Sequence, residues 1–167
     1  LGMPMIGHVY KRVKMSKILS EVYIATCDKE IYDYVESIGG KAVMTSDRHE
    51  RCSDRCAEAM INIEKQTREK CDIMVLVQGD EPLISPDHID KVINFHKKNI
   101  EADIILPTLK IKLADNQNLI KVVTDNKKNV LYLSRAKIPL EFKKKNSFFK
   151  KHLSIISFKK NALIKYS

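Results

Sequence analysis

The residues most able to do chemistry lie in one short segment, Val77-Gln78-Gly79-Asp80-Glu81-Pro82. It follows the apolar run 72–77, which is typical of a buried strand in a parallel sheet. Ligands of open α/β sheets bind beyond the carboxyl ends of the strands, where Asp80 would present a hard oxygen donor. One carboxylate together with phosphate oxygens is the usual protein site for Mg²⁺. The same residues also suit a turn that only ends the strand, and their types leave both interpretations open.

Cysteine and histidine do not add a second metal site. The four cysteines are Cys27, Cys52, Cys56 and Cys71. Cys52 and Cys56 would share a helix face, but the sequence has no CxxC pair and no two histidines at metal-ligand spacing. The first residues show no signal-peptide pattern, so we expect reduced thiols and a cytoplasmic location.

The charge balance is basic, with 30 lysines and arginines against 21 acidic residues and a formal net charge of +9. A basic chain can bind nucleic acid or an anionic small molecule. Much of the excess lies in short lysine clusters without the interleaved aromatic residues that single-strand binders use. We therefore favour solvated lysines and expect no nucleic-acid partner. No apolar run approaches the roughly 20 residues of a membrane-spanning helix, so no membrane partner is expected either.

The elements that must position this segment alternate through the first hundred residues. Helical spacing of apolar residues predicts helices that begin at Pro4, after Asp28, near Ser53 and at Ser85-Pro86. Apolar runs predict strands at 21–26, 41–44 and 72–77. Asp28 is a suitable N-cap, and Gly39-Gly40 suits the end of the helix that follows it. Such alternation favours right-handed βαβ units and a parallel sheet.

The later part of the chain is richer in strands. They are predicted at 102–109, 120–124, 130–134 and 153–158. Residues 125–129 form a turn signal between two of them, so 121–135 reads as a hairpin. The charged stretch 141–151 is predicted as a loop, and a helix begins near Asn161. Together these elements predict a mixed three-layer α/β fold of one domain, residues 1–167, with an inserted hairpin region.

Five colinear segments resemble the 3-deoxy-manno-octulosonate (Kdo) cytidylyltransferases, the CMP-Kdo synthetases. Val77–Pro82 is similar to the family's metal-binding motif, and Gly2-Met3-Pro4-Met5-Ile6 resembles the opening of its first helix. The other matching segments are Gly39-Gly40 with Val43-Met44-Thr45 and His49, then Lys121-Val122-Val123 with Ser134–Pro139, and finally His152-Leu153. The matches run in order over nearly the whole chain.

This resemblance implies a nucleotide-diphospho-sugar transferase-like, Rossmann-like fold and a sugar-activating reaction. The anomeric hydroxyl of the sugar acid attacks the α-phosphate of CTP, and pyrophosphate leaves. By the same resemblance the cofactor is Mg²⁺ with Asp80 as its ligand, and Gln78 lies near the sugar. Thr45, Cys52, Ser53 and Arg55 lie on the cytidine side, while Arg135 and His152 hold the sugar acid. Members of the family tend to form homodimers.

Arg135 and His152 each have a structural alternative. An arginine fork suits a carboxylate because it donates two parallel hydrogen bonds, but Arg135 could also cap a pair of strands. His152 could be a satisfied histidine at a strand edge. The residue types do not decide between these roles.

The sequence departs from the family pattern in two places. Cys52 stands where the nucleotide-contacting loop has a glycine, next to Arg51 in place of a small residue. Ile156 occupies the position of a sugar-binding tyrosine. The phosphate loop before Gly2 and the later segment with a second metal carboxylate have no counterpart, so we expect a core truncated at both ends, inactive or nearly so by itself.

Three rival interpretations stand beside this one. The parent enzyme could activate an acylneuraminate or another sugar acid. The chain could be an inactive fragment of such an enzyme. Outside the enzymes, a basic nucleic-acid-binding module predicts binding that weakens steeply with salt and is indifferent to CTP.

Overall fold

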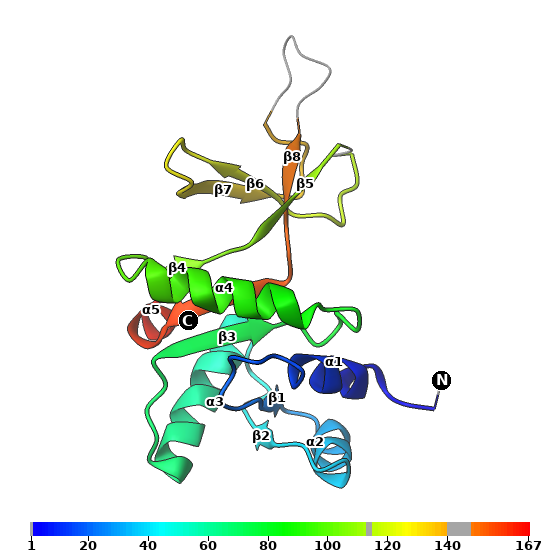
Figure 1. Ribbon diagram of the computed structural model, residues 1–167. Helices are drawn as coiled ribbons and strands as arrows, with labels where there is room; N and C mark the ends of the chain where they lie inside the picture. The colour runs from blue at the N-terminus through cyan, green and yellow to red at the C-terminus, as the bar shows by residue number, and fades with distance from the viewer. Residues whose placement is uncertain (1, 113–114, 140–147) are drawn as a thin grey trace. The chain divides into compact units, whose positions relative to one another are not determined.

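The helices and strands of the chain separate into two units, Leu1–Ile105 with Ile155–Ser167 and Leu106–Ser154 (Figure 1). The computed structural model describes residues 2–112, 115–139 and 148–167. The first unit contains α1 (Met5–Val13), β1 (Ile24–Thr26), α2 (Lys29–Ser37), β2 (Ala42–Met44), α3 (Cys52–Thr67), β3 (Ile73–Val77), α4 (Pro86–Lys98), β4 (Ile104–Ile105), β9 (Ile155–Lys159) and α5 (Lys160–Tyr166). The second contains β5 (Thr108–Ile111), β6 (Lys121–Thr124), β7 (Val130–Ser134) and β8 (Phe149–His152).

Local sequence signals explain most of the helix ends in the first unit. The Asp28 carboxylate accepts hydrogen bonds from the backbone N–H groups of Glu30 and Ile31, at 2.8 and 3.4 Å, and so caps α2. Gly39 ends that helix with a φ of 71°, a left-handed conformation that glycine adopts without steric cost. Ser85 occupies the N-cap position of α4 as predicted, but its side chain makes no capping hydrogen bond.

The strand pairing is mixed. β1 and β2 pair in parallel, as the predicted βαβ unit requires. β3 was expected at the centre of a parallel sheet, but it hydrogen-bonds antiparallel to β9, which pairs antiparallel with β4 on its other side. This antiparallel pairing has a topological reason. The chain returns to the first unit only after residue 154, and the strand that it then adds runs against β3.

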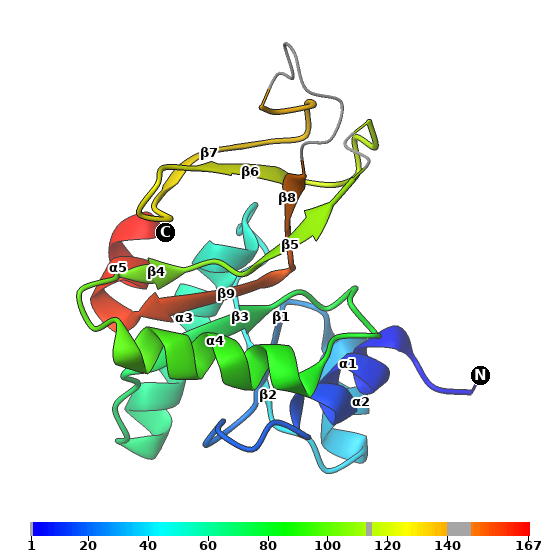
Figure 2. The same cartoon turned by 45° about the horizontal axis from the view of Figure 1, so that its top comes forward.

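Helices cover both faces of the β3–β9 sheet, which gives the expected three layers (Figure 2). On one face α1 and α4 pack against alternate residues of β3, Val75 and Val77, around the buried Ile155. On the other face α3 and α5 pack around Leu76 and Phe158. Period-two alternation along β3 therefore sends side chains into two apolar layers. Within the described residues, none of the helices combines the length and apolar character of a bilayer crossing.

The second unit is a four-stranded antiparallel sheet in the order β5-β8-β6-β7. The predicted hairpin is confirmed as β6 and β7, and its turn closes through hydrogen bonds between Asp125 and Asn129. The predicted strand 102–109 is instead two strands, β4 and β5, separated at Leu106-Pro107. Pro107 has no N–H group to donate to a ladder, which favours a break there.

Two further boundaries differ from the sequence analysis. The predicted strand 153–158 is confirmed as β9, which begins two residues later, at Ile155, and ends at Lys159. The strand β8 before it ends at His152. The charged stretch 141–151 contains the start of β8 in place of a loop throughout, and its residues 141–147 lie outside the described residues. β8 offers no alternating pattern to read from the sequence, because Phe149 and His152 are buried and the two lysines between them are half-buried.

Candidate functional site

The predicted metal-binding turn borders a cavity of the first unit with a volume of about 780 Å³. Gln78, Gly79 and Asp80 line it directly after β3, and Cys52 and Arg55 line it from the start of α3. Much of the remaining wall consists of apolar side chains from α1, β1, α3 and β3. The structure therefore brings four predicted site residues to one cavity, at the end of a strand and the beginning of a helix.

The turn itself is held by backbone hydrogen bonds. The N–H of Glu81 donates to the carbonyl of Gln78 at 3.3 Å, and the N–H of Ile84 donates to that of Glu81 at 3.0 Å. A Cβ at Gly79 would lie 3.3 Å from Ile6 Cδ1, tighter than an ordinary contact, so glycine lets this turn lie against α1. Asp80 is exposed, which leaves its carboxylate accessible at the cavity wall.

Arg55 connects the start of α3 to the loop that follows β2. Its Nη1 donates to Thr45 Oγ1 at 2.7 Å and to the carbonyl of Ser46 at 3.2 Å. The backbone N–H of Thr45 in turn donates to the carbonyl of Thr26, at the end of β1. Two residues predicted on the cytidine side are thus in direct contact, and Arg55 fixes the loop at the carboxyl ends of the parallel strand pair.

Ser53 is placed differently from its predicted neighbours. The side chains of α3 that line the cavity recur as Cys52, Arg55, Cys56, Ala59, Met60 and Ile63. This is the spacing of one helix face, and Ser53 falls outside it. Ser53 is buried, and its hydroxyl donates to Asp54 Oδ1 at 3.1 Å, while Arg51 is exposed and pairs with the other oxygen of that carboxylate.

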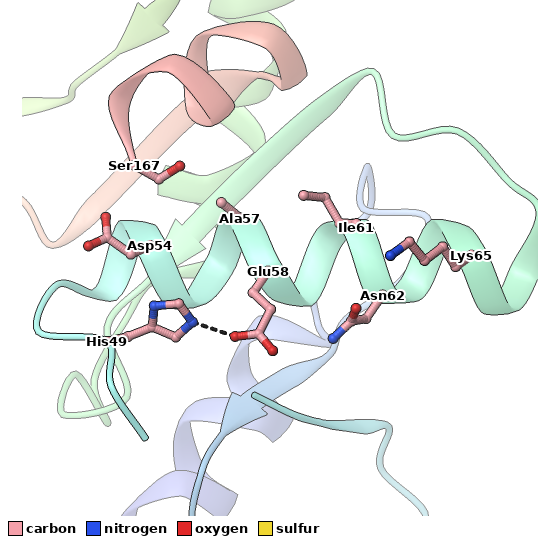
Figure 3. Close-up of a pocket in the computed structure, with 8 residues that line it drawn as sticks. All are labelled: His49, Asp54, Ala57, Glu58, Ile61, Asn62, Lys65 and Ser167. Carbon is pink, nitrogen blue, oxygen red and sulfur yellow. Dashed lines mark hydrogen bonds and ion pairs between the residues drawn. The ribbon is translucent and has the colours of Figure 1, made fainter. Parts of the chain in front are cut away.

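Glu58 is a residue of this region that sequence reasoning missed. Its carboxylate accepts a hydrogen bond from the backbone N–H of Ser46 at 3.0 Å and pairs with His49 Nε2 (Figure 3). The Ser46 N–H and then His49 hold the pKa of Glu58 below its ordinary value. The two side chains belong to a pocket of about 500 Å³ along α3. The nine-residue separation between them carries no local signal, so only the fold could reveal the pair.

The two cysteines at the start of α3 differ in environment. Cys52 is exposed, whereas Cys56 is half-buried one turn later. Desolvation by burial, with a smaller contribution from Cys52, raises the pKa of the Cys56 thiol to about 12. All four cysteines are free thiols.

Arg135 and His152 belong to the second unit. Arg135 directly follows β7 and is exposed, and its Nη1 donates to the carbonyls of Gln117 and Asn118, each at 3.2 Å. His152 is the buried last residue of β8, and its backbone N–H donates to the carbonyl of Ile120 at 2.8 Å. The predicted residues therefore form two sets, one in each unit.

Ile156, which departs from the family pattern, lies in the sheet of the first unit. It is opposite Leu76 in the β3–β9 register and packs against the apolar cluster beneath α3 and α5. Its side chain thus contributes to the core of that face.

Comparison with known proteins gives consistent matches over the chain. The family model described as cytidylyltransferase matches residues 1–167. The 3-deoxy-manno-octulosonate cytidylyltransferase of Thermodesulfovibrio yellowstonii is 40% identical over 93% of this chain, and that of Fusobacterium nucleatum is 39% identical over 99%. A relative from Shewanella piezotolerans, 35% identical over 94% of the chain, is named 8-amino-3,8-dideoxy-manno-octulosonate cytidylyltransferase.

The chain is also similar to solved structures. One is CMP:2-keto-3-deoxy-manno-octonic acid synthetase complexed with CTP, with a TM-score of 0.88 and 30% identity over 99% of this chain and 67% of that one. A 4-diphosphocytidyl-2C-methyl-D-erythritol synthase from Anaerococcus prevotii, at 16% identity and a TM-score of 0.58, shares the fold.

The match covers only part of each relative. The chain spans 65% of the Thermodesulfovibrio relative, 66% of the Fusobacterium relative and 64% of the Shewanella relative. Within that span the family model extends from the first residue to the last. The chain belongs to the cytidylyltransferase family.

Proposed function

We propose that this protein transfers CMP from CTP to a 2-keto-3-deoxy sugar acid, Kdo first of all, and releases pyrophosphate. The observation that carries the proposal is the shared cavity of Gln78, Asp80, Cys52 and Arg55. It occurs in a chain whose relatives at 39–40% identity are named for this reaction. A structure at 30% identity, named as a complex with CTP, supports the choice of nucleotide.

Asp80 is the residue proposed to hold Mg²⁺. It fits the chemistry of the ion, because an exposed carboxylate at a cavity wall can bind Mg²⁺ together with phosphate oxygens and water. Among the described residues, no group of three or more His, Cys, Asp or Glu side chains could hold a metal ion. The ion, when bound, neutralises triphosphate charge and stabilises the transferred phosphorus centre.

The residues of the chain itself bind and orient the two substrates. Arg55 holds the loop at Thr45 and Ser46, which supports a fixed nucleotide-contacting surface beside Cys52. Gln78 would contact the sugar from the turn that also carries Asp80. Arg135 would pair with the sugar carboxylate, since a guanidinium donates two parallel hydrogen bonds to it. Catalysis then rests mainly on positioning the two reactants.

A second sugar acid is a specific alternative to Kdo as the substrate. A relative at 35% identity is named for 8-amino-3,8-dideoxy-manno-octulosonate. A panel of Kdo, its 8-amino analogue and N-acetylneuraminate, each with CTP and MgCl₂, separates these substrates by rate of pyrophosphate release, measured on the protein with residues 1–167 extended to the length of the relatives. We expect Kdo to give the highest kcat/KM.

The metal role of Asp80 is tested by Asp80→Asn. We expect pyrophosphate release to fall more than about 100-fold while the melting temperature is unchanged, because the amide keeps the shape and loses the charge. Asp87→Asn is the matched control, since Asp87 is an exposed aspartate in the first turn of α4. Full activity of Asp80→Asn would reject the metal role. No turnover with any of the three sugars, together with no CTP binding by calorimetry, would reject the function.

We also propose that the protein forms a homodimer, as the family resemblance implies. The edge strand β7 supports this proposal. Its residues Val130, Leu131, Tyr132 and Leu133 are 42–63% exposed, an apolar strand at the edge of the second sheet. Exposed apolar edges favour pairing with another chain.

A further inference from the structure

Lys121, the first residue of β6, is a fully buried lysine in the second unit. Its ammonium group donates to three backbone carbonyls, those of Asn116 at 3.0 Å, Leu119 at 2.9 Å and Arg135. An ammonium has three N–H donors, and all three are used. No carboxylate among the described residues forms a salt bridge with it. A buried cation is costly unless its hydrogen bonds are satisfied, so this arrangement needs the three carbonyls in place.

The register of the sheet places Lys121 between the two residues proposed to hold the sugar acid. It is opposite Ser134 on β7, whose next residue is Arg135. On its other side it is opposite Lys151 on β8, whose next residue is His152. Neighbouring strands are about 4.8 Å apart, so the backbones of Arg135 and His152 flank β6 at roughly 10 Å.

Two cations share the carbonyls of the loop before β6. The loop presents four successive backbone carbonyls, those of residues 116–119. The ammonium of Lys121 donates to the carbonyls of Asn116 and Leu119. Arg135 Nη1 donates to the two carbonyls between them, of Gln117 and Asn118. Lys121 also holds the carbonyl of Arg135 itself. The backbone of Arg135 is therefore fixed from the buried side, while its exposed guanidinium has Nε and Nη2 without a hydrogen bond in the described part of the chain.

We propose that Lys121 is a positioning residue for the sugar acid and acts through Arg135. The buried ammonium fixes the start of the segment after β7, and this aims the remaining guanidinium donors at the substrate carboxylate. An apolar side chain of similar length would fill the same space but would leave the carbonyls of Leu119 and Arg135 without this donor. The carbonyl of Asn116 would keep only the backbone N–H of Leu119, at 3.2 Å. The inference rests on the proposed function, because it needs Arg135 to bind the sugar acid.

The first test is Lys121→Met in the pyrophosphate assay with CTP, MgCl₂ and Kdo. We expect the KM for Kdo to rise roughly 10- to 100-fold, because small displacements of a positioning group are costly. The KM for CTP and kcat should change by less than about twofold, the signature of lost substrate binding. A merely structural role would instead lower the active fraction, which reduces kcat at unchanged KM values. Lys110→Met, an exposed lysine of β5 in the same sheet, is the matched control.

The second test is a double-mutant cycle with Arg135→Met. If Lys121 acts through Arg135, the double variant should have the same KM for Kdo as Arg135→Met alone, because the two effects are not additive. Additive effects would overturn the proposal, and so would an unchanged KM for Kdo in Lys121→Met. If the Met variant does not fold, Lys121→Gln, which keeps an amide donor, replaces it in the same comparison of KM values for Kdo. A wild-type protein that neither binds nor converts Kdo would refute the proposed function instead.

Discussion

Replacing Arg55 with methionine should loosen the start of α3 by a measurable amount. The change removes two hydrogen bonds from Nη1, to Thr45 Oγ1 at 2.7 Å and to the carbonyl of Ser46 at 3.2 Å. Thr45 is only 8% exposed, so water does not readily replace its lost partner. Hydrogen bonds from a charged donor contribute about 1.5–3 kcal/mol each, and partial exposure of Arg55 reduces this. We expect a total loss of about 2–3 kcal/mol in the free energy of unfolding.

Urea denaturation followed by circular dichroism measures that free energy directly, and the melting temperature should fall by about 5–10 °C. Arg51→Met is the matched control, because Arg51 is exposed and makes surface contacts, an ion pair with Asp54 and a cation–π contact with the Tyr166 ring at 5.7 Å. Exposed pairs contribute about 0–1 kcal/mol, so the control should stay near wild type. Calorimetry with CTP adds a functional readout, in which Arg55→Met should bind more weakly than the wild-type protein. Equal stability of the two variants would refute the role given to Arg55.

Three further outcomes follow from the same geometry. Iodoacetamide at pH 8 should alkylate Cys52 well before Cys56, because burial raises the pKa of the Cys56 thiol to about 12. A mass-spectrometric time course measures the two rates, and equal rates would contradict this prediction. The pKa of Glu58 is lowered in the folded state, so its ionised form contributes stability above pH 4.5 that is lost as the pH falls through the lower folded value. Glu58→Gln should therefore show a smaller drop in melting temperature from pH 7 to pH 3 than wild type, and a parallel drop would argue against the pair. If β7 forms the dimer interface, Leu131→Lys with Leu133→Lys should give a monomer by light scattering, whereas a persistent dimer would place the interface elsewhere.

The sequence by itself was sufficient for the local features of this protein. The strand that ends at Val77, the turn that carries Asp80, the cap at Asp28 and the hairpin at 121–135 all follow from neighbouring residues. Such signals are readable because hydrophobic period, capping and turn chemistry act over a few positions. The family resemblance rests on these same local segments.

Only the tertiary structure decided which distant residues meet. The antiparallel pairing of β3 with β9, the contact of Arg55 with Thr45 and the pair of Glu58 with His49 join residues without a shared local pattern. Lys121 shows the limit most clearly. In the sequence it is one of many lysines, yet in the structure it is fully buried. Its three acceptors are backbone carbonyls, which every residue carries, so no side-chain pattern could have marked them before the chain was folded.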